Sequence, residues 1–321
     1  MKYFIITIDT EGDNLWEYKP GNNITTENSR YIPRFQNLCE RYGYKPVYLV
    51  NYEMANEKYF YDFAISSLKH NNCEIGIHPH AWNSPPYCEL DNHFAGYGPP
   101  YLTEYPLSVM RQKFDALFSL ITERFQCRPE SHRAGRWTMN QDYFDILISY
   151  GIKIDTSVTP HISWKSSMGH STGGSDYRRS SEEPFPVKHS SGENKLTEIP
   201  VTIRKIRCNT PGTGKGSSVR NFLVSARNAL FGKIIWLRPN GRNLSEMMLL
   251  IDHVQKSESG YIMFMLHSSE LMPGGSPAFR TAGSIEKLFQ DIKTIFERIS
   301  NGFTGKTLKD YPALSTGMNG T

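Results

Sequence analysis

The chain of 321 residues has only five cysteines, and no two of them have the C-x-x-C spacing of a metal-binding pair. They are Cys39, Cys73, Cys88, Cys127 and Cys208. An odd number of scattered cysteines argues against a disulfide framework and against a cysteine-ligated zinc site. We therefore expect reduced thiols, and the chemistry must lie in other residue types.

Long hydrophobic runs and blocks of like charge are also missing. No stretch approaches the ~20 apolar residues of a membrane-spanning helix, and the mean hydropathy is −0.49. Lysine and arginine number 36 against 32 acidic residues, a formal charge of +4, without a basic block that would bind nucleic acid. The composition predicts a soluble globular protein with neither a membrane span nor a nucleic-acid partner.

The N-terminus lacks the features of a secretory signal. It reads MKYFIITID, in which one lysine and a short apolar run are followed at once by acidic residues, without a small-residue cleavage site. These residues predict a core β-strand. On this basis we expect a cytoplasmic protein.

Apolar periodicity alternates between strand and helix along the chain. Apolar, β-prone runs predict strands at 3–9, 46–52, 74–77, 130–133, 152–157, 196–203 and 261–267. Helical spacing and capping residues predict helices at 31–42, 57–70, 110–125, 140–151, 243–255 and 284–299. This alternation predicts a (β/α) barrel or a distorted relative of one, with an open doubly wound sheet as the alternative.

One domain accounts for most of the chain. We expect residues 1–301 to form a single catalytic domain and residues 302–321 a C-terminal tail. Two segments interrupt the alternation, 84–106 with many Pro, Gly and Tyr residues and 161–193 with many Ser, Gly and charged residues. They are typical of long loops over one face. In such barrels the C-terminal ends of the strands carry the chemistry.

Paired side chains follow the first and third expected strands. Asp9 and Glu11 have i, i+2 spacing in extended chain, which places both carboxylates on one side. His78 and His80 have the same spacing. Two imidazoles with a carboxylate suit a divalent metal and leave coordination positions open for water. Each pair by itself would also fit solvated loop residues.

Two further strand ends carry chemically active residues. Arg133, after the fourth strand, can hold a carboxylate, and His267, at the end of the last, can donate a proton. Trp82 and Trp137 adjoin these positions, and their flat faces suit stacking on a sugar ring, with packing inside loops as the alternative. Acids, paired histidines, an arginine and a further histidine at four strand ends predict a metal-assisted hydrolase.

These motifs resemble, in order along most of the chain, those of the polysaccharide deacetylases, the NodB-homology or carbohydrate esterase family four type. The stretch TIDTEG at 7–12 resembles a variant first motif, which implies that Asp9 is the catalytic base and Glu11 a metal ligand. The stretch EIGIHPH at 74–80 resembles the second motif, whose two histidines bind the metal. The usual second histidine lies four residues after the first, where Trp82 stands, so His80 is assigned as the ligand.

The later motifs complete the resemblance. Arg133, followed by glycine and tryptophan, resembles the third motif, whose arginine positions the base, and Leu266-His267 resembles the fifth, whose histidine is the general acid. The adjoining SSEL at 268–271 is similar to a subgroup found with cell-surface polysaccharide biosynthesis. The family implies a distorted (β/α) barrel and a divalent metal such as zinc, which is the metal we expect here. It also implies hydrolysis of an acetyl group from an acetylated saccharide or glycan, with metal-bound water as nucleophile.

Two other functions stay open on the sequence. A glycoside hydrolase would pair Asp9 or Glu11 with an opposed acid, but it would leave His78 and His80 without a role. A non-catalytic glycan-binding relative would be compatible with the altered histidine spacing.

Overall fold

The computed structural model describes residues 1–17, 23–82, 84–87, 99–192, 195–208 and 218–312. Parts of three expectations fall outside these ranges: Cys88 with 88–98 of the first long loop, position 193 at the end of the second, and 313–321 of the tail.

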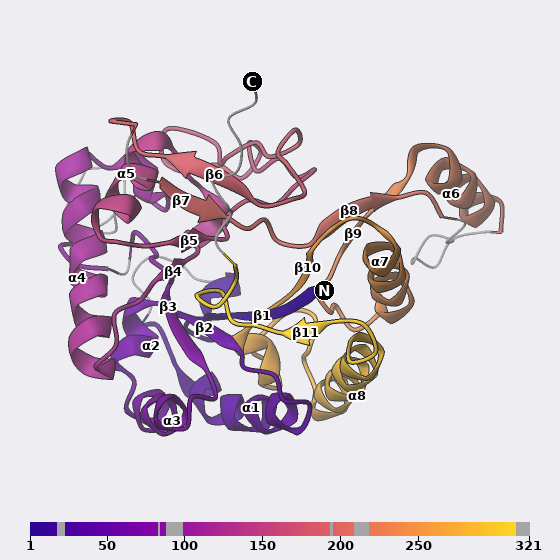
Figure 1. Cartoon of the computed structure of the whole chain (residues 1–321), viewed down its shortest axis with the longest axis horizontal. Helices are drawn as coiled ribbons and strands as arrows, with labels where there is room; N and C mark the ends of the chain where they lie inside the picture. Colours follow the sequence, from indigo (N-terminus) through magenta and orange to yellow (C-terminus); the bar gives the residue numbers. More distant parts are fainter. Residues whose placement is uncertain (18–22, 83, 88–98, 193–194, 209–217, 313–321) are drawn as a thin grey trace.

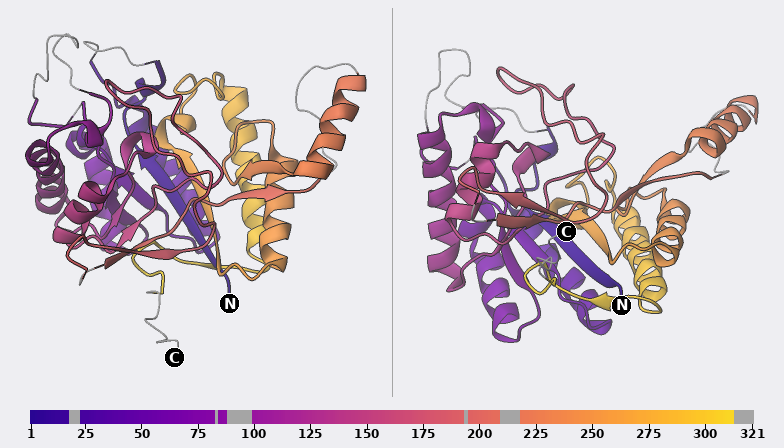
Figure 2. Two further views of the ribbon diagram at one scale, coloured as in Figure 1. Left: turned by 90° about the horizontal axis from the view of Figure 1, so that it is seen from above. Right: turned by 45° about the horizontal axis from the view of Figure 1, so that its top comes forward.

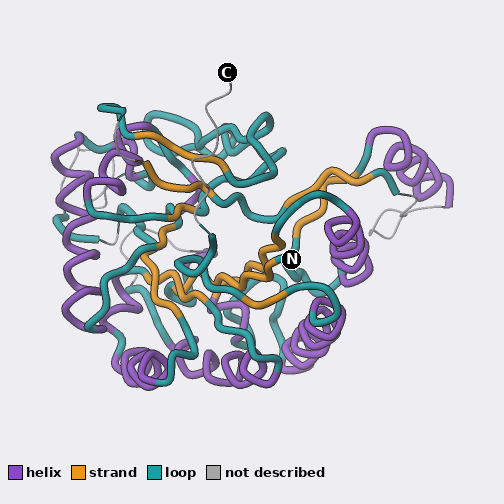
Figure 3. The backbone as a smooth tube through the Cα atoms, viewed as in Figure 1, coloured by secondary structure: helices purple, strands orange, loops and turns teal. Residues whose placement is uncertain are grey.

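A curled, mostly parallel sheet forms the centre of the molecule, with helices along its outer face (Figures 1 and 3). Its strand order is β10-β1-β2-β3-β4-β5-β7-β6, with β11 also paired to β1. All neighbours are parallel except β6 and β7, which are antiparallel. The expected distorted (β/α) barrel is confirmed.

The strands are β1 (Tyr3–Thr10), β2 (Val47–Val50), β3 (Glu74–Ile77), β4 (Ser131–His132), β5 (Ile154–Asp155), β6 (Phe185–Lys188), β7 (Lys195–Glu198), β8 (Ile203–Ile206), β9 (Lys233–Trp236), β10 (Tyr261–His267) and β11 (Thr304–Gly305). The α-helices are α1 (Ile32–Arg41), α2 (Tyr52–Asn56), α3 (Lys58–Lys69), α4 (Leu107–Phe125), α5 (Gln141–Ser149), α6 (Ser218–Phe231), α7 (Leu244–Lys256) and α8 (Ala282–Ile299).

The first strand is buried on both faces, as its continuous apolar sequence predicts. Phe4, Ile6 and Ile8 belong to the core between sheet and helices, whereas Ile5 belongs to a second cluster on the inner side of the sheet. Side chains alternate between the two faces of a strand, so Asp9, four residues after Ile5, lies on the inner side as well. The two core layers therefore fix which side of the sheet the acidic residues at the end of β1 occupy.

The strand expected at 196–203 is wrong as a single element. The structure divides it into β7 and β8, which belong to two different sheets, with Pro200 between them. Proline has no N–H for a strand ladder, so the chain leaves the sheet there.

Irregular backbone around this break closes the gap between β5 and β10. The amide of Val201 donates to the carbonyl of Val158 at 3.0 Å, and that of Leu237 donates to Thr202 at 3.1 Å. Met265 of β10 then donates to Leu237 at 3.2 Å. The barrel is thus distorted because single hydrogen bonds replace a full strand at this position.

Several elements were not expected from the sequence, namely α2, α6, β6, β9 and β11. The antiparallel strands β8 and β9 form a separate two-stranded sheet, which carries α6 away from the barrel (Figures 1 and 2). Within the expected tail, β11 pairs with β1 and Leu308 is fully buried. Among the described residues, no helix is both long and apolar enough to span a membrane.

Candidate metal and catalytic site

A pocket of about 630 Å³ opens at the C-terminal ends of the strands. Asp9 and Glu11 reach it from the end of β1, His78 and His80 from the chain after β3, and His267 from the end of β10. Parallel strands put their carboxyl ends at one edge of the sheet, which is why residues so distant in sequence meet here. Both long loops contribute walls, through Tyr101 in the first and Trp164 and Met168 in the second, among others.

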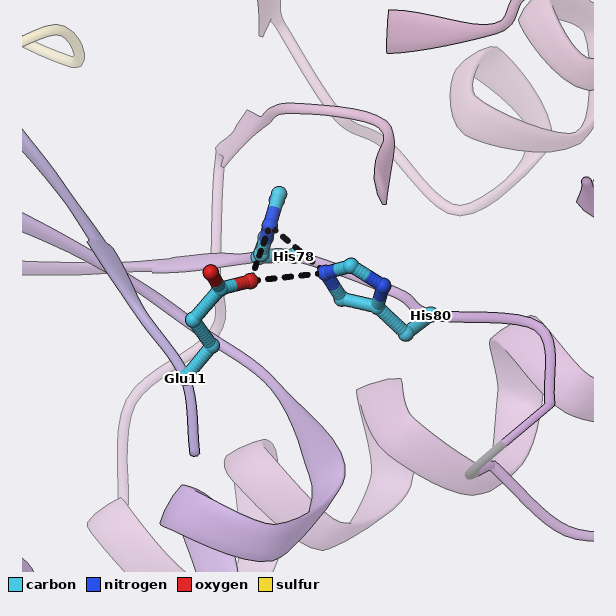
Figure 4. Close-up of side chains that lie close together, drawn as sticks. All are labelled: Glu11, His78 and His80. Atoms are coloured by element: carbon cyan, nitrogen blue, oxygen red, sulfur yellow. Dashed lines mark hydrogen bonds and ion pairs between the residues drawn. The ribbon is translucent and has the colours of Figure 1, made fainter. Parts of the chain in front are cut away.

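Glu11, His78 and His80 converge inside this pocket (Figure 4). Oε2 of Glu11 lies 2.8 Å from Nε2 of His80 and 3.4 Å from Nε2 of His78. The two Nε2 atoms are 3.2 Å apart, and all three side chains are buried. Three donor atoms therefore face one point, as the same-side spacing of the sequence predicts.

The backbone around these residues holds them in place. The amide of Glu11 donates to the Ser268 hydroxyl at 3.1 Å, and the Asn28 amide group donates to the Glu11 carbonyl at 2.8 Å. Gly135 lies against the histidine loop, where an added Cβ would come 2.5 Å from the Pro79 carbonyl. Only glycine permits this close approach.

The hydrogen bond of His78 sets its tautomer. Nδ1 of His78 lies 2.8 Å from the carbonyl of Arg133 and must donate to it, because a carbonyl oxygen only accepts. The neutral ring then presents the Nε2 lone pair to the convergence point, an arrangement typical of metal-binding histidines. Nδ1 of His80 is buried without a hydrogen-bond partner among the described residues, so no hydrogen bond there fixes the tautomer of this ring.

The electrostatics keep the carboxylate charged. Burial opposes the ionisation of Glu11, but His267, His78 and His80 together hold its pKa well below the usual range. Burial lowers the pKa of His80. Burial acts in the same direction on His78, but the carboxylates of Asp9 and Glu11 outweigh it and raise that pKa. One anionic oxygen between imidazole nitrogens is a donor set that fits a divalent cation such as zinc.

Asp9 is held by a fully buried arginine. Nη1 of Arg133 donates to Oδ1 of Asp9, and Nη2 donates to the Thr7 hydroxyl at 2.8 Å. Nε donates to the Thr156 carbonyl at 3.1 Å, so the guanidinium is fixed from both sides. Burial opposes the ionisation of Asp9, yet the charges of Arg133, His78 and His267 lower its pKa. Asp9 is therefore an oriented carboxylate with one oxygen facing the pocket.

His267 stands opposite Asp9, because the two residues are direct partners across the β1–β10 ladder. Its Nε2 lies 3.7 Å from both Oδ2 of Asp9 and Oε1 of Glu11. Arg238 approaches the other ring nitrogen at 2.9 Å. Nδ1 also lies 3.3 Å from Oε2 of Glu270, so Arg238 and Glu270 both contact this nitrogen and Nε2 is the ring nitrogen that faces the pocket.

The expected sugar-stacking tryptophans both line the pocket, but they differ in surroundings. Trp82 is half-buried and packs edge-on against His80, with ring centroids 4.7 Å apart. Trp137 is only 8% exposed. Its ring lies near the guanidinium of Arg133 and is stacked with Trp164 at 6.3 Å. Trp137 thus has less free surface for a ligand than Trp82.

Sequence reasoning missed the pocket residues Trp16, Arg136 and Arg238, and Glu270 next to the pocket. Trp16 packs on His267, and Glu270 accepts from both the His267 amide and Arg238. Glu270 is three residues after His267, a helix-capping spacing that offered a local signal. Arg136 stands only three residues after Arg133, and this short separation in sequence was a signal for it. No local pattern marked Trp16 or Arg238, which reach the pocket only through the fold.

No protein-family model and no curated protein sequence matches the chain. Solved structures, in contrast, share its fold. A candidate glycoside hydrolase/deacetylase from Parabacteroides distasonis aligns with a TM-score of 0.60 at 12% identity, over 95% of this chain and 69% of that one. A candidate polysaccharide deacetylase from Mycobacterium smegmatis aligns with a TM-score of 0.50 at 13% identity, over 98% and 96%.

A third similar structure belongs to an enzyme with a different activity. The 4-alpha-glucanotransferase from Thermococcus litoralis aligns with a TM-score of 0.53 at 13% identity, covering 97% of this chain and 40% of that one. At such identities the likeness establishes the fold, and function must be argued from the site.

Proposed function

We propose that the chain is a polysaccharide deacetylase of the carbohydrate esterase family four type, a metal-dependent hydrolase that removes an acetyl group from an acetylated saccharide. The observation that carries the proposal is the convergence of Glu11, His78 and His80 on one point beside the Asp9–Arg133 pair. The likeness to structures named as deacetylases supports it.

The three converging residues would hold a divalent metal, which we propose to be zinc. When bound, such an ion polarises the acetyl carbonyl and lowers the pKa of a water molecule to about 7. Asp9 acts as general base, because its carboxylate is ionised and Arg133 fixes its orientation. His267 acts as general acid, because its Nε2 faces the pocket opposite Asp9.

The remaining walls of the pocket suit a sugar. Trp82 offers an aromatic ring beside the proposed metal, and Trp137 supports the arginine that orients the base. The resemblance at 268–271 further supports a role in cell-surface polysaccharide biosynthesis, with the protein in the cytoplasm. Fractionation of cells that express the native protein tests that location.

A glycoside hydrolase fits the site less well. Among the described residues, the carboxylates that line the pocket are those of Asp9 and Glu11, which extend from the same strand end. Glycoside hydrolysis needs two carboxyl groups on opposite sides of the scissile bond. Here Glu11 is engaged by two imidazoles, and the opposite side carries His267.

Metal analysis combined with acetate release tests the function. Wild-type protein loaded with zinc should bind one ion per chain and release acetate from acetylated sugar nucleotides or glycan fragments. A His78→Ala, His80→Ala double variant should lose both properties. His253→Ala, which removes an exposed histidine of α7, should keep both. Sugar cleavage without acetate release, or equal metal content in all three proteins, would contradict the proposal.

A further inference from the structure

The arm formed by β8, α6 and β9 stands out from the barrel (Figures 1 and 2). Its two strands pair with each other and not with the nine-stranded sheet, and α6 lies at its far end. Among the described residues, none of those that line the candidate site lies in α6, β8 or β9. The arm is therefore separate from the candidate catalytic site.

The arm exposes large apolar side chains close together. Leu230 and Phe231 at the end of α6 are each 67% exposed, and Ile234 in β9 is 39% exposed. Among the described residues only ten large apolar side chains are exposed, and three of them fall within these five positions. Such a concentration on a protruding element marks an interaction surface rather than scattered surface hydrophobicity.

All charged residues in the segment 199–245, which contains the arm, are basic. Residues 199–245 contain nine lysines and arginines and no aspartate or glutamate, although the formal charge of the whole chain is only +4. Arg204, Lys233 and Arg238 are neutralised by acids from outside the segment.

Three basic residues of the arm remain exposed. Lys205, Arg207 and Arg227 make no ion pair within the part of the chain that the structure describes. The charges of the arm that are not paired with an acid are therefore all positive, and its sequence contains no acidic residue.

Basic and apolar side chains share the same faces. Arg227 precedes Leu230 by three residues and Phe231 by four, which places all three on one side of α6. In the β8–β9 ladder, Lys205 is the direct partner of Ile234, so these two side chains leave the sheet on one face. The arm therefore combines apolar contact area and positive charge at the same positions.

We propose that this arm docks the protein on an anionic lipid surface. Apolar side chains of an interfacial helix enter the boundary between headgroups and acyl chains, while flanking basic residues are attracted to anionic headgroups. A second copy of the chain is a poorer occupant, because two arms without acidic residues would repel each other. Nucleic acid would engage the charges but would leave Leu230 and Phe231 in water. The proposal goes beyond the deacetylase function and does not rest on it.

Co-sedimentation with vesicles tests the docking surface. The full chain should bind vesicles of phosphatidylcholine with phosphatidylglycerol, bind pure phosphatidylcholine weakly, and dissociate at high salt. A Leu230→Ser, Phe231→Ser variant should bind anionic vesicles about tenfold or more weakly. A Lys205→Glu, Arg227→Glu variant should bind several-fold more weakly and show a flatter salt dependence.

Matched controls separate the arm from general surface effects. Leu107→Ser removes an apolar side chain that is 48% exposed on α4, and Arg41→Glu reverses an exposed charge at the end of α1. Both should bind vesicles as the wild type does, and all variants should keep the wild-type circular dichroism spectrum and melting temperature. Failure to bind anionic vesicles, or equal loss in the controls, would overturn the proposal. So would a dimer that only the arm variant dissociates, or binding to RNA in place of vesicles.

Discussion

Arg136 and Trp137 adopt left-handed backbone conformations in succession, with φ of 56° and 63°. For residues with a Cβ this conformation costs roughly 1–2 kcal/mol each. The amide of Trp137 donates to Ala134 at 3.1 Å, and the Tyr177 hydroxyl donates to the Trp137 carbonyl, which together hold the turn. The turn places the exposed Arg136 in the wall of the pocket and packs the Trp137 ring against Arg133. The strained backbone therefore positions two residues of the candidate site.

A pair of variants measures this strain. Arg136→Gly and Arg136→Ala both remove the guanidinium, but only glycine adopts φ of +56° freely. The glycine variant should therefore have a free energy of unfolding about 1 kcal/mol higher than the alanine variant. Urea denaturation provides the measurement. Equal stability of the two variants would show that the turn relaxes without cost.

Asp9→Asn tests the proposed base. The amide oxygen can still accept from Arg133, while the basic carboxylate is lost, so kcat should fall by about a hundredfold or more with metal content unchanged. Asp62→Asn, at an exposed ion pair on α3, should retain full activity. If Asp9→Asn keeps wild-type turnover of the acetylated substrate, another group is the base.

His267→Ala tests the acid in the same assay. Loss of the Nε2 proton donor should lower kcat by a similar factor of about a hundred. His70→Ala, which removes an exposed histidine at the end of α3, serves as its control. Full activity of the His267 variant would remove this residue from the mechanism.

At the scale of elements, the ends of β4, β5 and β7 share a buried polar cluster. Nδ1 of His132 lies 2.6 Å from Asp155, and Nε2 lies 2.8 Å from the Tyr143 hydroxyl. Glu198 of β7 accepts the amide of Val158 at 2.9 Å and lies beside Asp155. The cluster links three strands directly behind Arg133, where short strands provide few ladder hydrogen bonds.

The cluster makes stability depend on pH in a defined direction. Burial and the charge of Asp155 raise the pKa of Glu198 well above its usual range. The folded protein therefore keeps a proton on Glu198 that the unfolded chain releases above about pH 4, so the contribution of Glu198 to stability falls as pH rises beyond that point.

Glu198→Gln removes this titration. The free energy of unfolding of the variant relative to wild type should increase with pH above about pH 4, by up to about 1.4 kcal/mol per unit until the folded pKa is reached. Urea denaturation from acid to neutral pH measures the difference. Gln290→Ala, which removes an exposed side chain of α8 and changes no titratable group, serves as the control and should show no such rise. A constant difference across the range would contradict the raised pKa.

At the scale of the whole molecule, the site draws together strands from both ends of the chain. β1 and β10 are adjacent and parallel, although about 250 residues separate them in sequence. Ligands from β1 and from the chain after β3 surround the proposed metal position, so a bound ion would cross-link distant segments. Metal binding should therefore stabilise the complete fold.

Metal removal provides the corresponding prediction. At a free metal concentration 100 times Kd, binding should add about 2.7 kcal/mol to the free energy of unfolding. For a chain of this size, Tm should rise by several degrees. Calorimetry of chelated and zinc-loaded protein measures the shift, which His253→Ala should retain and His78→Ala should lose. An equal shift in both variants would place the stabilising ion elsewhere.

Local patterns in the sequence determined most of the elements and the composition of the site. The apolar runs of β1 and β10, the helical spacing in α4 and the Asn140 cap of α5 required no tertiary information, since each depends on neighbours within a few residues. The same-side spacing of Asp9 and Glu11 and of the two histidines followed from strand geometry alone.

Only the tertiary structure decided what these residues face. The division of 196–203 at Pro200, the approach of Arg238 to His267 and the position of Trp16 depend on segments distant in sequence. The protruding arm is likewise a tertiary feature, because α6 has an apolar periodicity that resembles that of a core helix, yet it ends in exposed Leu230 and Phe231. Local sequence specifies which residues can pack, whereas the fold decides which of them find a partner within the chain.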